Sequence, residues 1–442
     1  MKVYTIGGFS EVGKNMCAVE IEDEIVIFDM GLYLPKLLNR EEEGDTRELS
    51  TNELIKIGVL PDDTFLEENS HKVKAIVISH AHLDHVGAAP YLAAKYDCPI
   101  IGTPYTIEIL KTMVRDNEVR LKNKYIALTS NDLYKISDNI KLEFVNMTHS
   151  TVQVVLCALH SDEGIFVYAN DFKFDNNPGI GKAPNYKKLE ELGKKGVKVA
   201  VIDALNSKEE KRTPSEKIAK ELLKDVMYGV NAVNKVILVT TFSSHIPRLK
   251  SIIEFGKHLN RNIVFLGRSL HKYVSAAQKL GIVDFKRDIE LIGYSNSVKK
   301  KLSMIEKNRD KYIIVCTGNQ GEPGSILSRL SKNELPFGFK DGDIVIFSCR
   351  TIPTPETIAN RELLERKLKQ KKARIFKDIH VSGHLAREDH RDFINMMKPE
   401  HIIPAHGDIE KLTGLSELAT EMGYKFNKTI HVMQDGSVLE VK

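Results

Sequence analysis

The chain has 442 residues, of which 42% are hydrophobic and 28% are charged. At roughly 150 residues per domain, this length predicts two or three compact units with sizeable cores. The sequence has no run of about 18 apolar residues that could span a bilayer, so we expect a soluble protein with no membrane partner. The first residues lack the apolar segment of a signal peptide, and the five scattered cysteines form no CxxC pair. We therefore expect a cytoplasmic protein without disulfides.

The charge is unevenly distributed along the chain. The net charge is +4, but residues 204–375 hold 33 Lys and Arg against 18 Asp and Glu, a net of +15, which leaves −11 for the remainder. Abundant Lys and Glu with only five Gln are also typical of heat-tolerant proteins, which is one sufficient explanation of the lysine content. A polyanionic substrate explains in addition why the excess is confined to one segment, because clustered Lys and Arg neutralise phosphates.

Six short apolar runs end abruptly in polar residues and predict buried strands followed by turns. In chain order they lie in residues 24–31, 74–82, 141–149, 164–171, 198–203 and 401–408. Helical patterns follow or precede some of them, in 87–97 and 387–400, and the chain closes with an expected strand in 429–441. This alternation predicts an α/β protein whose sheets are covered by helices.

The basic middle segment has an alternation of its own. Strand patterns occur in residues 235–244, 262–269, 312–325 and 343–349, and helical patterns in 247–259, 272–280 and 356–372. The charge boundary and the pattern boundary agree, which predicts a separate open α/β domain inserted into the first one. We expect residues 1–203 and 376–442 to form one domain and residues 204–375 the inserted one.

The strongest local signal is SHAHLDH, which directly follows the apolar run KAIVI. Positions two apart in an extended segment point to one side, so His80 and His82 can share one metal, while the turn lets Asp84 and His85 face a second. Four such polar groups together are costly to bury without an ion. Other polar residues end other strands, and because ligands collect where strand ends meet, they are candidates for the same site. These residues are Asp29, His149, Asp171 and His406. Taken singly, an Asp after a strand is more often a helix cap or a turn residue.

Taken together, Asp29, the HAHLDH motif, His149, Asp171 and His406 resemble the metallo-β-lactamase superfamily in its nucleic-acid-processing branch, and the basic insert resembles a β-CASP domain. Within that branch, GGFSEVGKN at 7–15, TTFSSHIPRL, GRSL at 267–270, TGNQGEP at 317–323 and SGH at 382–384 resemble ribonuclease J. The resemblance covers nearly the whole chain and implies an αββα four-layer sandwich with an inserted α/β β-CASP domain. Bacterial members continue into a further C-terminal domain, which leaves the assembly mode open, a homodimer included.

The resemblance implies two Zn²⁺ ions per chain, about 3.5 to 4 Å apart. His80, His82 and His149 would hold one ion; Asp84, His85 and His406 the other; Asp171 would bridge them. Mn²⁺ or Mg²⁺ could replace zinc at the more oxygen-rich position. Asp29 would fix a ligand histidine through its other ring nitrogen. Besides Asp84, the expected catalytic residues are His384, as the acid that protonates the leaving 3′ oxygen, and Asp203, which would orient it.

In the family, Gly-rich and Ser-rich loops form a pocket for a 5′ monophosphate. The resemblance therefore implies a processive 5′ to 3′ exoribonuclease that acts on single-stranded RNA in RNA decay and maturation. Other RNA-decay proteins are possible partners. The candidate phosphate-binding residues here are Ser243, His245, Arg268, Ser269, Gly318, Asn319, Gln320, Gly321, Ser382, Gly383 and His384. Asn319 stands where the bacterial pattern usually has Ser, and residues 34–61 look like a lineage-specific insertion whose acidic run, 41–45, is most simply a solvated loop.

Several alternative functions stay open. A β-CASP endoribonuclease of the cleavage-and-polyadenylation type carries the same metal ligands, whereas DNA-directed relatives tend to have an apolar residue in place of His406. A small-molecule metallohydrolase such as a glyoxalase-type thioesterase is disfavoured by the basic insert. A flavodiiron oxidoreductase has a carboxylate at the second position of the HxH pair, where this chain has His82. A catalytically inactive nucleic-acid-binding scaffold is disfavoured because every expected ligand is present.

Overall fold

The computed structural model of the protein describes residues 1–37 and 49–442. The acidic run 41–45, expected to form a solvated loop, lies outside these residues. Nearby, the short helix α2 (Thr51–Lys56) begins with a capping box, because the Ser50 hydroxyl accepts from the Glu53 N–H while the Glu53 carboxylate accepts from the Ser50 N–H. In the described part of the chain, no helix is both long enough and apolar enough to cross a membrane.

The first sheet has seven strands in the order β19-β1-β2-β3-β4-β5-β6. Strands β3 to β6 run parallel to one another. Strand β2 pairs antiparallel with β3, and β1 pairs antiparallel with β2. The bounds are β1 Lys2–Gly7, β2 Met16–Ile21, β3 Glu24–Phe28, β4 Val73–Ile78, β5 Ile100–Gly102, β6 Tyr125–Ala127 and β19 Ser437–Glu440. The predicted last strand, 429–441, is therefore wrong over 429–436. There the chain turns at Gly436, whose φ is +79° and whose N–H donates to the Thr5 carbonyl.

The second sheet has six strands in the order β18-β11-β10-β9-β8-β7. Here β10, β11 and β18 are parallel, so their carboxyl ends share one edge. The bounds are β7 Leu133–Lys135, β8 Lys141–Asn146, β9 Val155–Ser161, β10 Gly164–Ala169, β11 Val197–Asp203 and β18 His401–Ala405. Each of the six apolar runs predicted as strands thus contains one, since Val- and Ile-rich segments suit a sheet that is buried on both faces.

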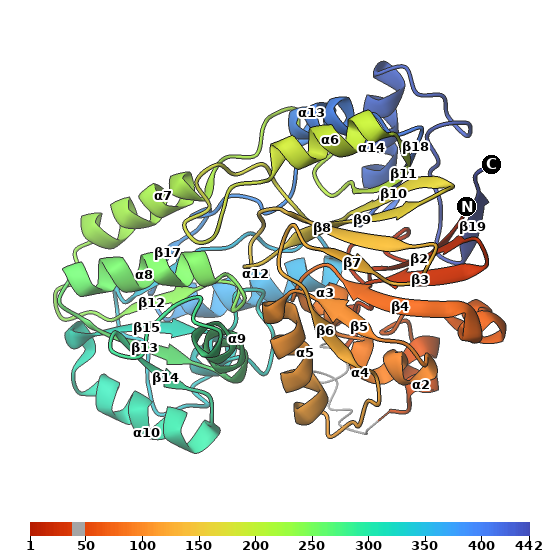
Figure 1. The fold of residues 1–442 in the computed structure, drawn as a ribbon. Coiled ribbons are helices and arrows are strands. Elements are labelled where there is room, and N and C mark those ends of the chain that lie inside the picture. The colour runs from red at the N-terminus through yellow and green to blue at the C-terminus, as the bar shows by residue number, and fades with distance from the viewer. Residues whose placement is uncertain (38–48) are drawn as a thin grey trace.

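The two sheets pack face to face with helices outside each, as Figure 1 shows. Phe28 and Val77 of the first sheet lie in one apolar cluster with Phe144 and Phe166 of the second. The helices on the second sheet are α6 (Tyr186–Lys195), α13 (Arg387–Met397) and α14 (Ile409–Glu421); those on the first include α3 (Leu83–Val86), α4 (Ala89–Leu92) and α5 (Pro104–Asp116), with the 3₁₀ segments η1 (Thr64–Lys72) and η2 (Ala93–Lys95). The expected αββα four-layer architecture is confirmed.

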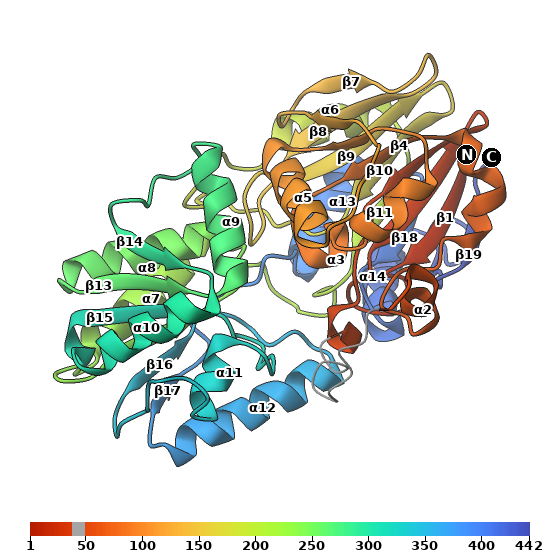
Figure 2. The ribbon, with the colours of Figure 1, turned by 90° about the horizontal axis from the view of Figure 1, so that it is seen from below.

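A third sheet forms a separate lobe, seen from below in Figure 2. All its strands are parallel, in the order β14-β13-β15-β12-β16-β17. The strands are β12 Ile237–Thr240, β13 Asn262–Leu266, β14 Ile289–Ile292, β15 Tyr312–Cys316, β16 Ile344–Phe347 and β17 Arg374–Phe376. The helices are α7 Glu216–Gly229, α8 Ile246–His258, α9 Arg268–Lys279, α10 Ser295–Glu306, α11 Ile326–Ser331 and α12 Pro355–Gln370, with η3 at Arg309–Lys311. The inserted α/β domain is confirmed, whereas its boundaries at 203/204 and 375/376 stay a prediction.

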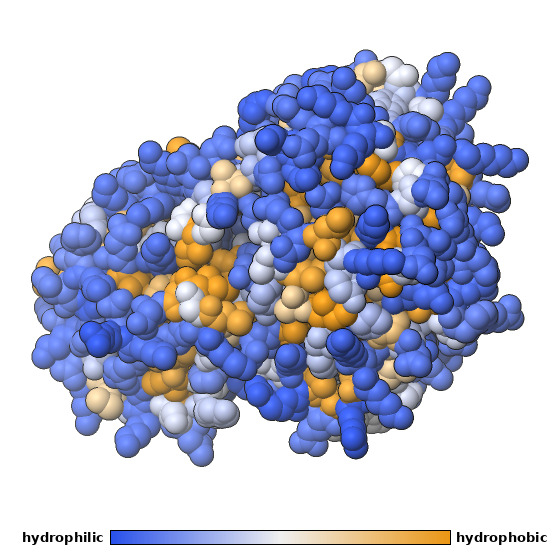
Figure 3. Space-filling view, in the orientation of Figure 1, coloured by the Kyte–Doolittle hydropathy of each residue, from blue (hydrophilic) through white to orange (hydrophobic). Residues whose placement is uncertain are grey.

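The surface in Figure 3 is mostly hydrophilic, with its apolar area gathered in the middle of the face, on either side of the line where the lobes meet. Contacts across this line include Tyr273 on α9, whose hydroxyl donates to the Ala81 carbonyl at 3.1 Å. Tyr105 on α5 in turn donates to the Tyr273 carbonyl at 3.2 Å. The inserted lobe is thereby fixed against the loop that carries the HAHLDH motif.

Candidate metal centre

Four of the predicted site residues, three expected ligands and Asp29, follow the carboxyl ends of parallel strands. Asp29 follows β3, His80 follows β4, Asp171 follows β10 and His406 follows β18. Asp29, Asp171 and His406 have φ values of 57°, 52° and 58°. Residues other than glycine adopt this left-handed backbone conformation at a cost of about 1–3 kcal/mol, and residues strained in this way concentrate at functional sites. The sharp turn at each strand end directs the polar side chain to the common edge.

The structure brings the seven predicted ligands together as two groups, in each of which the ligand atoms lie within 4.8 Å of one another. The first group is His80, His82, His149 and Asp171; the second group is Asp84, His85, Asp171 and His406. Asp171 belongs to both, and its Oδ2 lies 3.8 Å from His80 Nε2 and 3.1 Å from His85 Nε2. One carboxylate thus occupies the position that a bridging ligand between two metal ions requires.

The donor atoms of these groups fit divalent cations. His80 Nε2, His82 Nε2 and Asp171 Oδ1 are buried and have no hydrogen-bond partner among the described residues. Burial lowers the pKa of His82 to about 4 and that of His80 well below its usual value. Burial opposes ionisation of Asp171, but the surrounding imidazoles, His406 foremost, hold its pKa well below the usual range. Neutral imidazoles and an ionised carboxylate are the forms that bind metal.

Asp29 orients two of the predicted ligand histidines, His85 directly and His80 through Ser79. His85 Nδ1 donates to Asp29 Oδ2 at 2.7 Å, which directs its Nε2 toward Asp171. The same carboxylate accepts from the Ser79 main-chain N–H at 2.7 Å and from the Ser79 hydroxyl at 2.9 Å, and this hydroxyl lies 3.0 Å from His80 Nδ1. Partners of this kind fix the orientation of a metal-binding imidazole.

The segment that contains His384 lies against the first group. His149 Nδ1 donates to the Gly383 carbonyl at 2.6 Å, and a Cβ at Gly383 would lie 2.6 Å from that nitrogen, so only glycine fits. His384 Nδ1 donates to Asp203 Oδ2 at 2.7 Å. Burial disfavours the charged imidazole, but Asp203 and Asp171 outweigh it and raise the pKa of His384 to about 9. This histidine therefore holds a proton at neutral pH, and its Nε2 lies 4.0 Å from Asp171 Oδ2, an atom of both candidate metal groups.

One residue of this site, Asn15, is not predicted from the sequence. Its side chain is 1% exposed and lies within the second group, 2.8 Å from His406 Nδ1 and 3.1 Å from His85 Nε2. Asn15 ends the GGFSEVGKN motif, which carries part of the resemblance, but no local pattern distinguishes it from a loop asparagine.

Most of the candidate phosphate-binding residues lie at the carboxyl edge of the third sheet. Gly267 follows β13 and Gly318 follows β15, and a Cβ at Gly267 would lie 2.7 Å from the Thr317 side chain. Arg268 and Ser269, expected in a loop, instead form the first turn of α9 and are exposed. The turn that starts α9 thus lies against the loop after β15 at this edge, and the amino end of a helix is a position suited to a phosphate.

Other candidates have structural partners. The Gln320 side-chain amide donates to the Arg350 carbonyl at 3.0 Å and accepts from the Ile352 N–H at 2.8 Å. His245 is buried, with Nε2 3.4 Å from Glu216 Oε2. Ser382 accepts from Asn206 Nδ2 at 2.8 Å and so lies beside His384. The remaining candidates, Ser243 (half-buried), Asn319 (buried) and Gly321 (buried), belong to the loops after β12 and β15.

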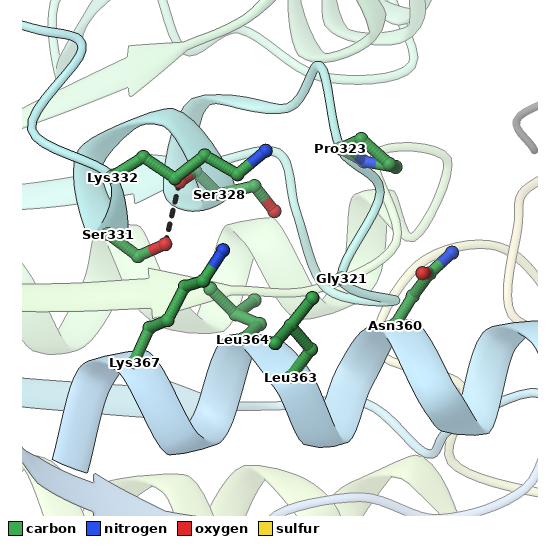
Figure 4. A pocket seen from close by; sticks show the side chains of 9 residues that line it. All are labelled: Gly321, Pro323, Ser328, Ser331, Lys332, Asn360, Leu363, Leu364 and Lys367. Atoms are coloured by element: carbon green, nitrogen blue, oxygen red, sulfur yellow. Dashed lines mark hydrogen bonds between the residues drawn. The ribbon is translucent and has the colours of Figure 1, made fainter. Parts of the chain in front are cut away.

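Gly321 also lines a pocket between α11 and α12 (Figure 4). The ammonium groups of Lys332 and Lys367 reach this pocket from the two helices, and neither forms an ion pair with a described residue. The Ser328 hydroxyl, buried at its wall, has no described hydrogen-bond partner. The pocket thus offers uncompensated positive charge and a free hydroxyl next to the loop after β15.

A buried arginine joins the inserted lobe to the segment that leads to His384. Arg248 on α8 is 0% exposed and donates to both carboxylate oxygens of Glu216, at 2.6 and 2.8 Å. It also donates to the Ser348 carbonyl at 2.9 Å and to the Ile379 carbonyl at 3.0 Å. The end of β16 and the chain just before Ser382 are therefore held by one guanidinium group.

Three models of known protein families match successive parts of the chain. Residues 12–183 match a model described as the metallo-beta-lactamase superfamily. Residues 234–365 match the beta-CASP domain of ribonuclease J, and residues 370–433 match a Zn-dependent metallo-hydrolase RNA specificity domain.

Relatives that match the chain over nearly their full length are named ribonuclease J. The chain is 42% identical over 441 residues to ribonuclease J of Methanocaldococcus jannaschii, covering 99% of this chain and 98% of the relative. It is also 42% identical to ribonuclease J of Pyrococcus abyssi, covering 100% and 97%. The relative from Synechocystis is 29% identical, and the match covers 66% of its length. A solved structure of a protein of unknown function from Enterococcus faecalis has the same fold, with a TM-score of 0.67 at 16% identity over 99% of both chains.

Proposed function

Because the chain belongs to the ribonuclease J family, a family of metal-dependent ribonucleases, we propose that it degrades single-stranded RNA from the 5′ end and prefers a 5′ monophosphate. The observation that carries this proposal is the connection between a phosphate-binding edge and the metal centre. Ser348, at the end of β16, donates through its hydroxyl to the Ile379 carbonyl at 2.9 Å. Five residues later the same segment places His384 beside Asp171.

Two Zn²⁺ ions suit the two groups, one held by His80, His82 and His149 and the other by Asp84, His85 and His406, with Asp171 common to both. When bound, such ions neutralise charge on a phosphate and lower the pKa of a bound water to near neutrality. Mn²⁺ or Mg²⁺ suits the second group better than the first, because the second group has more oxygen donors.

The residues of the chain supply the proton for the leaving group. His384 is protonated at neutral pH, since the Asp203 carboxylate 2.7 Å from its Nδ1 stabilises the imidazolium. Its Nε2 lies 4.0 Å from Asp171 Oδ2 and so faces the metal groups. From there it can protonate the 3′ oxygen of the nucleotide that leaves, as a general acid with a nearby base to orient it.

The 5′ end is proposed to bind between the Ser382–His384 segment and the loops after β13 and β15. These loops present main-chain N–H groups at the carboxyl edge of a parallel sheet, which attract phosphate. Further along the bound RNA, Lys332 and Lys367 offer positive charge, not paired with a described residue, to the RNA backbone. The net +15 of residues 204–375 supports this assignment, since the excess lies in the lobe that carries these loops.

The proposed place of action is the cytoplasm. All five cysteines are buried and free, as in proteins of a reducing compartment.

A time course on internally labelled RNA tests the proposal. Parallel samples carry a 5′ monophosphate or a 5′ triphosphate, with a DNA copy and a chelator as controls. We expect early release of mononucleotides from the monophosphate RNA, and none from the His82→Ala variant. Discrete internal fragments, or equal cutting of both 5′ ends, would contradict the end pocket and favour the endoribonuclease alternative.

A further inference from the structure

The amide of Asn15 lies among the ligand atoms of the second metal group. Its Nδ2 is 2.8 Å from His406 Nδ1, 3.1 Å from His85 Nε2 and 3.4 Å from Asp84 Oδ2. Its Oδ1 is 3.0 Å from the same nitrogen of His406. Asn15 is fixed in this place by the main chain, because its N–H donates to the Asp84 carbonyl at 2.9 Å and its carbonyl accepts from the Gly31 N–H at 2.9 Å.

These separations are those between neighbouring ligands of one metal ion. Ligand atoms about 2.0–2.2 Å from a divalent ion, at tetrahedral or octahedral angles, are about 2.8–3.6 Å from each other. The Asn15 amide meets this condition with three ligand residues of the second group at once. By contrast, the side chain of Asn15 forms no hydrogen bond with His80, His82 or His149 among the described residues, so the relation is specific to the second group.

The neighbours of Asn15 permit the amide oxygen to face the ligand set. At present Asn15 Oδ1 accepts from Asn170 Nδ2 at 3.0 Å, while Asn170 Oδ1 is buried without a described partner. If both amides turn over, Asn15 Nδ2 donates to Asn170 Oδ1 and Asn15 Oδ1 faces His85 and His406. The Asp84 carbonyl, which accepts from Asn15 Nδ2 at 3.1 Å, keeps its bond from the Asn15 main-chain N–H. The turn therefore leaves that carbonyl paired and keeps a hydrogen bond between the two amides, while Asn170 Nδ2 takes the place that has no described partner and gives up its bond to the Tyr168 hydroxyl.

We propose that Asn15 is an additional ligand of the second metal ion, through its side-chain oxygen; this rests on the proposed two-metal centre. An amide N–H cannot point at a cation, whereas an amide oxygen is a hard, neutral ligand. With Asn15 included, the second group has three oxygen-donor residues and two imidazoles, against one carboxylate and three imidazoles in the first. The ratio of Mn²⁺ affinity to Zn²⁺ affinity should therefore be higher at the second site than at the first.

Metal binding by the purified protein, without RNA, tests the assignment. Chelator-stripped wild type, Asn15→Ala and Asn15→Asp are titrated with Mn²⁺ and with Zn²⁺ in equilibrium dialysis, and free Mn²⁺ is followed by its electron paramagnetic resonance signal. Asn15→Asp has nearly the same shape as the wild type and keeps an oxygen, but it replaces the NH₂ donor by a second, negatively charged oxygen. Asn146→Ala is the matched control, since Asn146 is also buried but donates to the carbonyls of Lys182 and Ala183, away from the second group.

We expect Asn15→Ala to bind one of two Mn²⁺ ions about 10–100-fold more weakly, with the other ion unchanged, and Asn15→Asp to retain both. An Asn15→Ala protein that binds both ions like the wild type and Asn146→Ala would overturn the assignment. Equal losses in the Ala and Asp variants would also overturn it, because they would show that the Nδ2 donor matters and the oxygen does not. Wild type that binds fewer than two ions would refute the two-metal centre itself, and the assignment with it.

Discussion

Replacement of Arg248 by methionine tests whether one buried guanidinium joins the inserted lobe to residues 379–384, the segment that leads to His384. Arg248 is 0% exposed, and its partners are the Glu216 carboxylate and the oxygens of Ser348 and Ile379. Methionine fills much of the volume but leaves the Glu216 carboxylate, itself 5% exposed, without its main counter-charge. Removal of one partner from a buried pair costs about 3–5 kcal/mol.

The free energy of unfolding, measured by urea denaturation, should fall by that amount, and for a unit of 150–250 residues the midpoint temperature should fall by about 6–20 °C. Burial opposes ionisation of Glu216, yet His245 and Arg248 hold its pKa well below the usual range. Without Arg248, the Glu216 carboxyl group binds a proton more readily in the folded state. The difference in unfolding free energy between the wild type and the variant should therefore shrink as the pH is lowered, because protonation of Glu216 removes the unpaired buried charge.

Arg391→Met is the matched control, since Arg391 pairs with Glu388 and Glu421 but its side chain is 33% exposed. Exposed pairs of this kind contribute about 0–1 kcal/mol. The double variant Arg248→Met/Glu216→Gln should recover part of the lost stability, because no buried charge remains unpaired. If Arg248→Met loses no more stability than Arg391→Met, the reasoning about this network is refuted.

Three further predictions concern activity and RNA binding. Lys332→Gln and Lys367→Gln should each weaken RNA binding and lower its dependence on salt concentration by about one phosphate contact. The control Lys300→Gln, on α10, should do neither. An unchanged salt dependence in all three variants would exclude the α11–α12 pocket from the RNA path. If His384 is the general acid proposed above, the rate of hydrolysis should fall as the pH rises through about 9, and Asp203→Asn should move this fall to lower pH. A pH profile that Asp203→Asn leaves unmoved would contradict the general-acid role. Dialysis against a chelator should abolish hydrolysis and lower the midpoint of thermal unfolding, and added Zn²⁺ should restore both, because ions that bind only the folded chain stabilise it.

The layered sheets and the core of the metal centre are readable from local sequence. Alternation of Val- and Ile-rich runs with helical patterns predicts the strands, and a polar residue that follows a buried strand marks the carboxyl edge of the sheet. His80, His82, Asp84 and His85 lie within six residues, so a strand end and one turn suffice to aim them at a common point. Such features depend on neighbours in the chain, which is why periodicity reveals them.

The contacts between residues far apart in the sequence were decided by the tertiary structure. Asn15 meets His406 across 391 positions, and Arg248 meets Ile379 across 131, through hydrogen bonds that leave no trace in the periodicity of either segment. The turn at Gly436 and the start of α9 at Arg268 were likewise misjudged. An amide or a guanidinium has the same local pattern on a solvated loop as in a buried network. Only the packing of the sheets and the inserted lobe determines which distant atoms come within 3 Å, and therefore which polar residues become part of the site.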